Sequence, residues 1–357
     1  MLPLFQFVLR RILVIPISLF IITLVIYGGV MLTPPEARAE LYMPKNFGPY
    51  ATPERIAKRR ELIIQQYHLR DPFPVQYFYW AQSLLNGKWG YSPSMKEDVL
   101  PALLHRTPVT LELTLWSMLM LFPLGMISGI MAGWKRQGRF DQLFLGLASL
   151  ASSTPTIILA LVLLSVFYIN LGWFAPGRIS IPLAPDLLKD EFVTYTGMLT
   201  IDSLLNGRMD IFIDVSKHLV MPVFTLSLYY WATLGRVTRA NVMSERNKGY
   251  VTAAYARGLS DHSILRKHVY PNVLPPALVT LTLAATSILT GAFVVEIIFN
   301  FKGVSYIIVS AMSSIPDAPA ALGFTIYSII MVLLLTFLLD VLQALFDPRV
   351  REGILHT

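Results

Sequence analysis

The sequence contains no cysteine, and this absence excludes disulfide bonds, cysteine-ligated zinc and a thiol nucleophile. Charged residues are also scarce: Asp, Glu, Lys and Arg make up 14% of the 357 residues, against about 25% in a soluble globular protein. Hydrophobic residues make up 54%. This composition indicates a protein that crosses a membrane several times. We interpret the net charge of +7 as a signal of topology and of contact with the lipid bilayer, and not of nucleic-acid binding.

Sequence motifs for catalysis are missing as well. No G-x-x-x-x-G-K-[ST] nucleotide-binding motif occurs, because Gly87-Lys88 lacks the upstream glycine and is followed by Trp89. The six histidines include no H-E-x-x-H zinc motif, and the hydroxyls of Ser152 and Ser153 have no neighbouring base. We therefore expect that the chain is not an enzyme and that it binds no cofactor or metal itself.

Long apolar runs are what the sequence has instead. The run Ile12–Leu32 has 21 residues, or about 31 Å of helix, which is enough to cross a bilayer core of about 30 Å. Because this run is longer than the apolar core of a secretory signal, we predict an uncleaved anchor. With five further runs, the sequence predicts an all-α polytopic membrane protein with six transmembrane helices, the first within 1–33 and the others at about 109–133, 143–171, 218–235, 272–296 and 318–340.

The distribution of Lys and Arg predicts the orientation. With the N-terminus inside, the inner segments carry 14 of these residues and the outer segments five, when 33–108 is left out because it is too long for the positive-inside rule. We therefore expect both termini in the cytoplasm. The predicted parts are the first helix (1–33), a small helical extracytoplasmic cap (34–108), a membrane core (109–347) that includes a cytoplasmic loop (236–271), and a cytoplasmic tail (348–357).

The predicted cap contains signals for two helices. Thr52 can cap a helix with Pro53 at its first position. Pro74–Leu85 is predicted as a second helix, which ends at Asn86-Gly87. The segment is therefore expected to fold and not to be a plain connector.

The cytoplasmic loop has signals for two short helices. Tyr250–Arg257 is rich in helix-forming residues, and Gly258 allows a break because it adopts positive φ without a Cβ clash. Ser260 can cap a second short helix through Val269, and Pro271 is expected to prevent its simple continuation. From the residues alone two roles stay open. The small side chains could let another protein dock, or the basic helices could rest on lipid headgroups.

This loop resembles the cytoplasmic EAA loop of ABC importer permeases, in which E-A-A is followed after three residues by Gly and after nine more by I-x-L-P. Here Thr252-Ala253-Ala254 is followed at the same spacing by Gly258 and then by the stretch HVYP, which ends at Pro271. Thr in place of Glu and His in place of Ile resemble the dipeptide/oligopeptide/nickel branch of that family.

Four further stretches extend the resemblance over nearly the whole chain. They are HLRDPFPVQYFYWAQSLLNGKWGYS, TPVTLELTLWSMLMLFPLGMISGIMAGWKRQGRFDQ, GAFVVEIIFNFKGVSYIIVSAM with Lys302 where Pro is usual, and LDVLQALFDPRVR. The resemblance implies the type I ABC importer permease fold. It also implies a transmembrane subunit that forms half of the translocation path for peptides or a related solute.

The same resemblance implies partners. The chain would act in the cell membrane of a prokaryote with a second homologous permease, two ATPase subunits that bind ATP and Mg, and an extracytoplasmic solute-binding protein. The cytoplasmic loop would couple to an ATPase through Thr252, Ala253, Ala254, Arg257, Gly258, Leu259, His262, Ile264, Leu265, His268 and Pro271.

Two acidic residues lie near predicted helix ends, Glu296 and Asp340. A charge inside the bilayer is costly and often marks a transport path, whereas a charge at headgroup level costs little. Glu296 and Phe299, which share a motif, are therefore candidates for a gate or path, and structural pairing or a solvated helix end is the alternative. Arg349 is expected to anchor the C-terminal end. The alternative function is a self-contained secondary carrier, which would need ion-coupling charges in mid-membrane.

Overall fold

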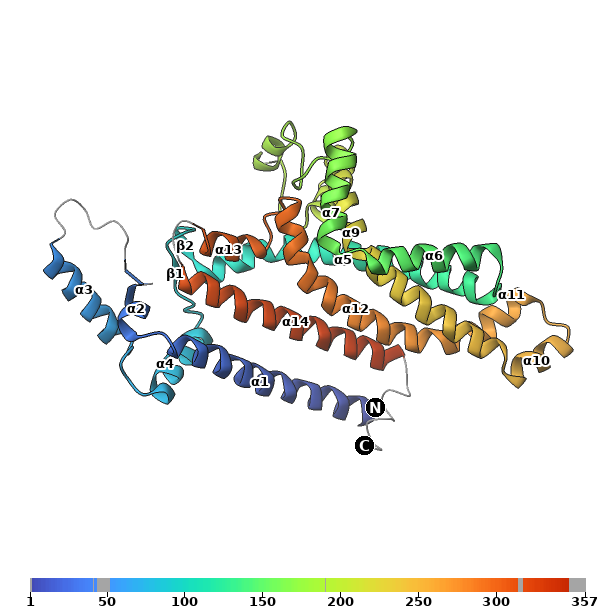
Figure 1. Ribbon diagram of the computed structural model, residues 1–357, viewed down its shortest axis with the longest axis horizontal. Helices are drawn as coiled ribbons and strands as arrows, with labels where there is room; N and C mark the ends of the chain where they lie inside the picture. The colour runs from blue at the N-terminus through green and yellow to red at the C-terminus, as the bar shows by residue number, and fades with distance from the viewer. Residues whose placement is uncertain (1, 41, 44–51, 190, 314–316, 347–357) are drawn as a thin grey trace. The chain divides into compact units, whose positions relative to one another are not determined.

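The computed structural model describes residues 2–40, 42–43, 52–189, 191–313 and 317–346 (Figure 1). These residues are mostly helical, and they form two compact units. Unit 1 takes in the described residues of Met1–Val8, Thr107–Gly303 and Leu334–Thr357, and unit 2 takes in those of Leu9–Arg106 and Val304–Leu333.

Long apolar helices dominate the chain. Among the described residues, five helices are long and apolar enough to cross a membrane: α1 (Leu2–Met31), α5 (Val99–Trp134), α9 (Met209–Arg246), α12 (Tyr270–Ile298) and α14 (Ala318–Phe346). A sixth span is present if a bent pair of helices within 139–170 is counted as one. The predicted helical membrane fold is therefore confirmed.

The bent pair covers the third predicted span. α6 (Arg139–Ser153) meets α7 (Thr156–Leu163) and its π-helical continuation η1 (Leu164–Asn170) at 100°. Pro155 causes the break, because proline has no N–H to donate and disfavours a helical backbone in the residue before it. Thr154 accordingly has an extended backbone, with ψ of 116°. The run 143–171 is therefore not one straight helix.

α9 is the central helix of unit 1, and it extends beyond the predicted span 218–235. It packs against α6, α7, α12 and the short helix α8 (Leu199–Leu205). A second short element, the 3-10 helix η2 (Ala184–Leu188), precedes α8. Hydropathy alone ends the predicted span at charged residues such as Arg236, whereas helical hydrogen bonding continues through them.

The part of α5 that belongs to unit 1 lies directly against α9. A Cβ placed on Gly129 of α5 would lie only 2.5 Å from the carbonyl oxygen of Gly235 in α9. Glycine is thus needed at Gly129 for the two backbones to approach this closely. The close contact fixes the position of the α5 side chains that are described below.

The 236–271 loop contains two short helices, as predicted. α10 (Gly249–Ala256) ends at Arg257, and Gly258 begins the turn with a φ of 75°. Ser260 occupies the N-cap position of α11 (Asp261–Ile264) with an extended backbone, although its side chain makes no capping hydrogen bond. In Figure 1, α10 and α11 lie where α9 ends and α12 begins.

The second helix does not end at Val269, contrary to the prediction, and it continues past Pro271 by way of a π turn. α11 passes through the π-helix η3 (Leu265–Val269) into α12, so that Asp261–Ile298 is one helix. A π turn holds one more residue than an α turn, and Pro271 follows it as the second residue of α12. We attribute the continuation to this wider turn, because proline interrupts a regular α-helix through a steric clash and a missing N–H.

Unit 2 contains the two helices predicted for the cap. α3 (Pro53–Gln66) begins at Thr52, whose hydroxyl accepts a backbone N–H of the first turn at 3.4 Å. α4 (Phe73–Leu85) ends at Asn86, and Gly87 follows with a φ of 74°. Both the N-terminal cap of α3 and the end of α4 thus agree with the prediction.

Further elements of unit 2 were not predicted. They are α2 (Pro35–Glu40), a hairpin of β1 (Tyr91–Ser92) and β2 (Glu97–Asp98), and α13 (Ser305–Ala311).

A buried carboxylate, Asp317, ties this hairpin to the start of α14. It accepts hydrogen bonds from the hydroxyls of Ser92 at 2.5 Å and Ser94 at 2.8 Å. Its other oxygen accepts the N–H of Ala320 at 3.0 Å. One side chain therefore both caps α14 and holds the hairpin.

Candidate functional site

The residues predicted to couple to an ATPase lie on α10, α11, η3 and the adjoining turns. They divide by exposure into three groups. The exposed ones are Thr252, Ala253, Arg257, Gly258, His262 and Pro271, the half-buried ones are Leu259, Leu265 and His268, and the buried ones are Ala254 and Ile264. The exposed group is open to a partner, and the buried pair holds the helices in place.

The buried face of the loop packs into the main core of unit 1. Val251, Ala254 and Ile264 belong to the same hydrophobic cluster as residues of α9 and α12. Gly258 is different, because no heavy atom lies within 4 Å of the place where its Cβ would be. Space therefore permits a side chain at Gly258, while its left-handed backbone disfavours one.

A group of polar side chains joins α10 to the helices on either side. Glu245, near the end of α9, accepts hydrogen bonds from the Lys248 ammonium and the Tyr250 hydroxyl. The amide of Asn272 in α12 donates to the same hydroxyl at 3.2 Å. Burial, with the neighbouring Glu245 carboxylate, raises the pKa of Tyr250 to about 12. The hydroxyl therefore keeps its proton at neutral pH.

Two arginines of α9 hold the turn between α5 and α6. The Arg246 guanidinium lies 5.4 Å from the ring centroid of Trp134 and donates to the Trp134 carbonyl at 2.6 Å. Arg239 donates to both carboxylate oxygens of the buried Asp141, at 2.5 and 2.8 Å. Sequence reasoning counted these arginines only as topology signals and missed their role in packing.

The two candidate gate residues lie at the other end of α12. Glu296 is 0% exposed and Phe299 is 1% exposed. Thr110 of α5 donates a hydrogen bond to Glu296. A Cβ on Gly303 would lie 2.3 to 2.6 Å from the atoms of the Glu296 carboxyl group. Glu296 is thus enclosed by protein groups and not by solvent.

A second buried carboxylate was missed by sequence reasoning. Glu112 of α5 is 1% exposed. It pairs with Arg178 at 2.6 Å and accepts the N–H and the hydroxyl of Thr200, both at 2.7 Å. Its signal was present, because it is an acidic residue inside the apolar run predicted at 109–133.

The segment that follows η1 connects these groups. The N–H of Gly177 donates to the carbonyl of Phe299 at 2.8 Å, and the next residue, Arg178, pairs with Glu112. This segment therefore bridges α5 and the end of α12. We call Glu112, Arg178, Glu296 and Phe299 the carboxylate end of unit 1, and we call 236–271 the loop end.

Other predicted features have less to contribute. Asp340 lies within α14, which continues past the predicted end at 340. Arg349 lies outside the described residues. Among the residues that the structure describes, no group of three or more His, Asp or Glu side chains could hold a metal ion.

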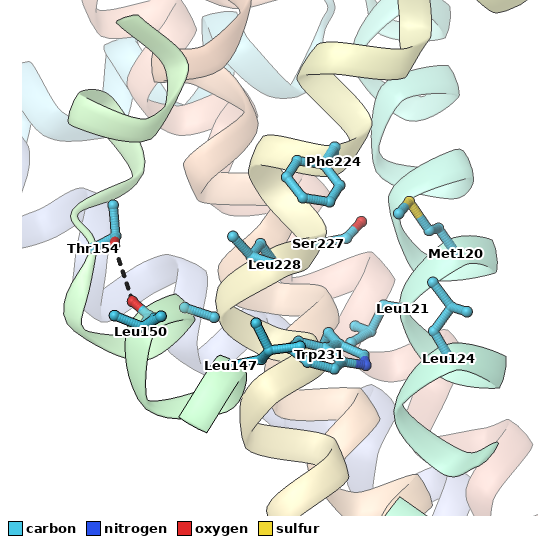
Figure 2. A pocket seen from close by; sticks show the side chains of 11 residues that line it. Met120, Leu121, Leu124, Leu147, Leu150, Thr154, Phe224, Ser227, Leu228 and Trp231 are labelled. Carbon is cyan, nitrogen blue, oxygen red and sulfur yellow. Dashed lines mark hydrogen bonds between the residues drawn. The ribbon is translucent and has the colours of Figure 1, made fainter. Parts of the chain in front are cut away.

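A pocket of about 420 Å³ opens between α5, α6 and α9. Figure 2 shows Met120 of α5 facing Phe224 and Trp231 of α9 across it. The hydroxyls of Thr154 and Ser227 donate to carbonyls of their own helices at 2.9 and 2.7 Å. None of the 11 lining residues is charged. The pocket thus suits hydrocarbon and offers no partner for an ionised group.

Known proteins are similar to this chain over most of its length. The family model described as "Binding-protein-dependent transport system inner membrane component" matches residues 123–352. The di/tripeptide transport system permease protein DppB of Pseudomonas aeruginosa (strain UCBPP-PA14) is 29% identical over 349 residues, which cover 97% of this chain and 99% of that protein. The oligopeptide transport system permease protein AppB of Bacillus subtilis (strain 168) is 28% identical over 292 residues, with coverage of 82% and 84%.

The fold is also found in a solved structure. A chain of the MetNI methionine ABC transporter, in inward facing conformations, is 16% identical with a TM-score of 0.50, and the match covers 69% of this chain and 96% of that chain. The predicted ABC permease fold is therefore confirmed. The chain is a membrane transport subunit and not an enzyme, and the secondary-carrier alternative finds no support. With a family model that spans more than half of the sequence, the chain belongs to the binding-protein-dependent transport system inner membrane components.

Proposed function

We propose that this permease subunit carries peptides and forms half of their translocation path. The observation that carries the proposal is the agreement among relatives. Those that align with more than four-fifths of the chain include permeases named for di/tripeptide, dipeptide and oligopeptide transport. A second, homologous permease would form the other half of the path.

The 236–271 loop is proposed to dock on an ATPase subunit. Two such subunits would bind ATP and Mg and would supply the energy that this chain lacks the motif to supply. Thr252, Ala253 and Gly258 support docking because their side chains are small and exposed. The buried Ala254 and Ile264 support it by keeping this surface in one shape.

The carboxylate end is proposed to be part of the gate. Glu296 and Phe299 are closed in by Thr110, Gly303 and Gly177. Opening this end would require these contacts to separate, and separation would expose the carboxyl group of Glu296 to the path. The tight packing of both residues supports a gate that is closed in this structure.

The 34–108 segment is proposed to receive an extracytoplasmic binding protein. Phe78 and Leu85 of α4 are 62% and 89% exposed, and their spacing of seven residues places them on one face of the helix. Changing both to Asp should lower the stimulation of ATPase activity by the loaded binding protein. Changing Ile181 and Leu188 to Asp is the control, because both lie outside this segment and each is 88% exposed. Equal stimulation of all three proteins would contradict this role.

The orientation needs its own test, and the cysteine-free chain permits one. With both termini in the cytoplasm, a cysteine at the exposed Ser260 should resist an impermeant thiol reagent in intact cells, and a cysteine at the exposed Lys88 should react. The reverse labelling pattern would refute the orientation and the docking role of the loop.

Uptake by the complete complex tests the substrate. The permease pair, the ATPases and the binding protein would be placed in liposomes, and uptake of labelled dialanine would be measured with and without ATP. We expect uptake that requires ATP and the binding protein and that excess unlabelled dipeptide abolishes. Uptake of nickel or an oligosaccharide in place of dialanine would contradict the peptide assignment.

A further inference from the structure

α10 is the one element of the loop with a turn at both of its ends. Asn247 and Lys248 separate it from α9, and the turn from Arg257 to Ser260 separates it from α11. α11 has no such freedom, because it is continuous with α12 through η3. Movement of α11 therefore reaches α12 directly, whereas movement of α10 must cross a turn.

The hydroxyl of Tyr250 connects α10 by hydrogen bonds to both α9 and α12. It donates to the Glu245 carboxylate of α9 and accepts from the Asn272 amide of α12 at 3.2 Å. The same amide donates to the His268 carbonyl at 2.8 Å, so its orientation is fixed. A hydrogen bond to a carboxylate is shorter and stronger than one between neutral groups.

A second tyrosine on α10 provides a natural comparison. The hydroxyl of Tyr255 donates to the Asp261 carboxylate at 3.0 Å, and Asp261 lies on α11. Tyr250 and Tyr255 are equally exposed, at 39% and 40%. Both hydroxyls thus bind a carboxylate, but that of Tyr250 connects α10 with α9 and α12 at once.

We propose that Tyr250 is a positioning residue that transmits the movement of a docked α10 to α9 and α12 together. This inference rests on the proposed docking of the loop. The apolar contacts of Val251 and Ala254 hold α10 against the core, and they tolerate some sliding because they have no preferred direction. The hydrogen bonds of the Tyr250 hydroxyl restrict the direction in which α10 can move, because a hydrogen bond weakens steeply when its angle changes.

Two variants separate this role from a general effect on the loop. Tyr250→Phe removes the hydroxyl that reaches both spans, and Tyr255→Phe removes one that stays within the loop. Each variant would be assembled with the ATPases and the binding protein in liposomes, and dialanine taken up per ATP hydrolysed would be compared with the unchanged chain. We expect Tyr250→Phe to lower this ratio by about fivefold or more, in line with the loss of a hydrogen bond to a charged group, with normal co-purification of the ATPase. Tyr255→Phe also removes a hydrogen bond to a carboxylate, but this bond stays within the loop and joins α10 to neither span, so the ratio should change by less than about twofold.

A distance measurement on the permease alone, without ATPase or binding protein, tests whether the Tyr250 hydroxyl holds α10 in place. Spin labels on cysteines at the exposed Ala256 and Thr290 would report the distance between α10 and α12. The distribution should be narrow for the parent and for Tyr255→Phe, and about twice as wide for Tyr250→Phe. An unchanged width in Tyr250→Phe, or equal losses in the two variants, would overturn the proposal. If no ATPase co-purifies with the parent chain, the docking proposal fails, while the distances still decide whether Tyr250 fixes α10.

Discussion

The two ends of unit 1 use polar side chains in opposite ways. At the carboxylate end, Glu112 and Glu296 are at most 1% exposed, and protein groups surround both. At the loop end, most of the residues that are proposed to meet a partner are exposed. Removing one partner of a buried ion pair costs about 3–5 kcal/mol, whereas an exposed pair is worth about 0–1 kcal/mol.

This difference suggests a division of tasks along α12. The carboxylate end keeps its shape until a large perturbation separates several contacts at once. The loop end is held by the hydrogen bonds of Tyr250 and by the apolar side chains of Val251, Ala254 and Ile264, and we propose that contact with a partner moves it. Substitutions at the first end should therefore reduce the amount of folded protein, and substitutions at the second should reduce coupling in a folded protein.

The largest effect is expected for Gly303→Ala at the carboxylate end. The new Cβ would lie 2.3 to 2.6 Å from the Glu296 carboxyl group, and the backbone would have to shift or the carboxylate would have to leave Thr110. We expect destabilisation by about 3 kcal/mol or more, measured by thermal unfolding in detergent. Gly146→Ala in α6 is the matched control, because nothing lies within 4 Å of its Cβ position. Equal melting temperatures of the two variants would show that Glu296 is not confined.

A smaller loss is expected when the ion pair of the same end is broken. Arg178→Met leaves the buried Glu112 carboxylate without its cation, with an expected cost of about 3 kcal/mol. Adding Glu112→Gln removes the uncompensated charge and should restore part of the stability, because Gln can still accept from Thr200. Denaturation of the single and double variants gives the coupling between the two residues. A double variant less stable than Arg178→Met would argue against the pair.

Gly258→Val tests the loop end, where we expect coupling and not folding to change. A β-branched residue is disfavoured at a φ of 75°, by about 1–2 kcal/mol, and its bulk would also block close approach. The variant should insert and accumulate normally but lose ATPase-coupled transport. Gly258→Asn separates the two causes, since Asn tolerates a left-handed backbone. Loss of transport in both variants would indicate that a partner approaches Gly258 closely. Loss of transport in Gly258→Val alone would indicate backbone strain. Unchanged transport in both variants would remove Gly258 from the docking surface.

The sequence predicted much of the fold because long apolar runs and capping residues act locally. The helix at Thr52, the break at Gly258 and five long apolar helices follow from such signals. What was missed is how each proline changes the helix around it. Hydropathy does not show that Pro155 bends the run 143–171 by 100°, or that a π turn lets the helix continue through Pro271.

The candidate site was predictable only where a motif marks it. The loop residues from Thr252 to Pro271 follow a linear pattern, but the pattern does not show that Ala254 is buried while Ala253 is exposed. Glu112 was missed because its partners, Arg178 and Thr200, are distant in sequence. A buried charge is visible in a sequence only as an interruption of an apolar run, and the partner that makes it tolerable is not.

The smallest effect is expected from pH at the loop end. Burial, with the Glu245 carboxylate, raises the pKa of Tyr250 from its usual value near 10 to about 12. A raised pKa means that the protonated hydroxyl is favoured in the folded protein. Its contribution is therefore complete below about pH 10 and is lost only as the pH rises through about 12. From about pH 6 to about pH 9, the Tyr250 hydroxyl should therefore keep its proton and its hydrogen bonds.

The distance between spin labels at Ala256 and Thr290 checks this constancy. Its distribution should stay narrow in the parent chain over that range and stay broad in Tyr250→Phe. Tyr255→Phe is the matched control, because the hydroxyl that it removes binds Asp261 within the loop. Its distribution should stay as narrow as that of the parent chain at every pH in the range. A parent distribution that broadens between about pH 6 and about pH 9 would contradict this prediction, because the Tyr250 hydroxyl keeps its proton there and some other group would then hold α10 in place.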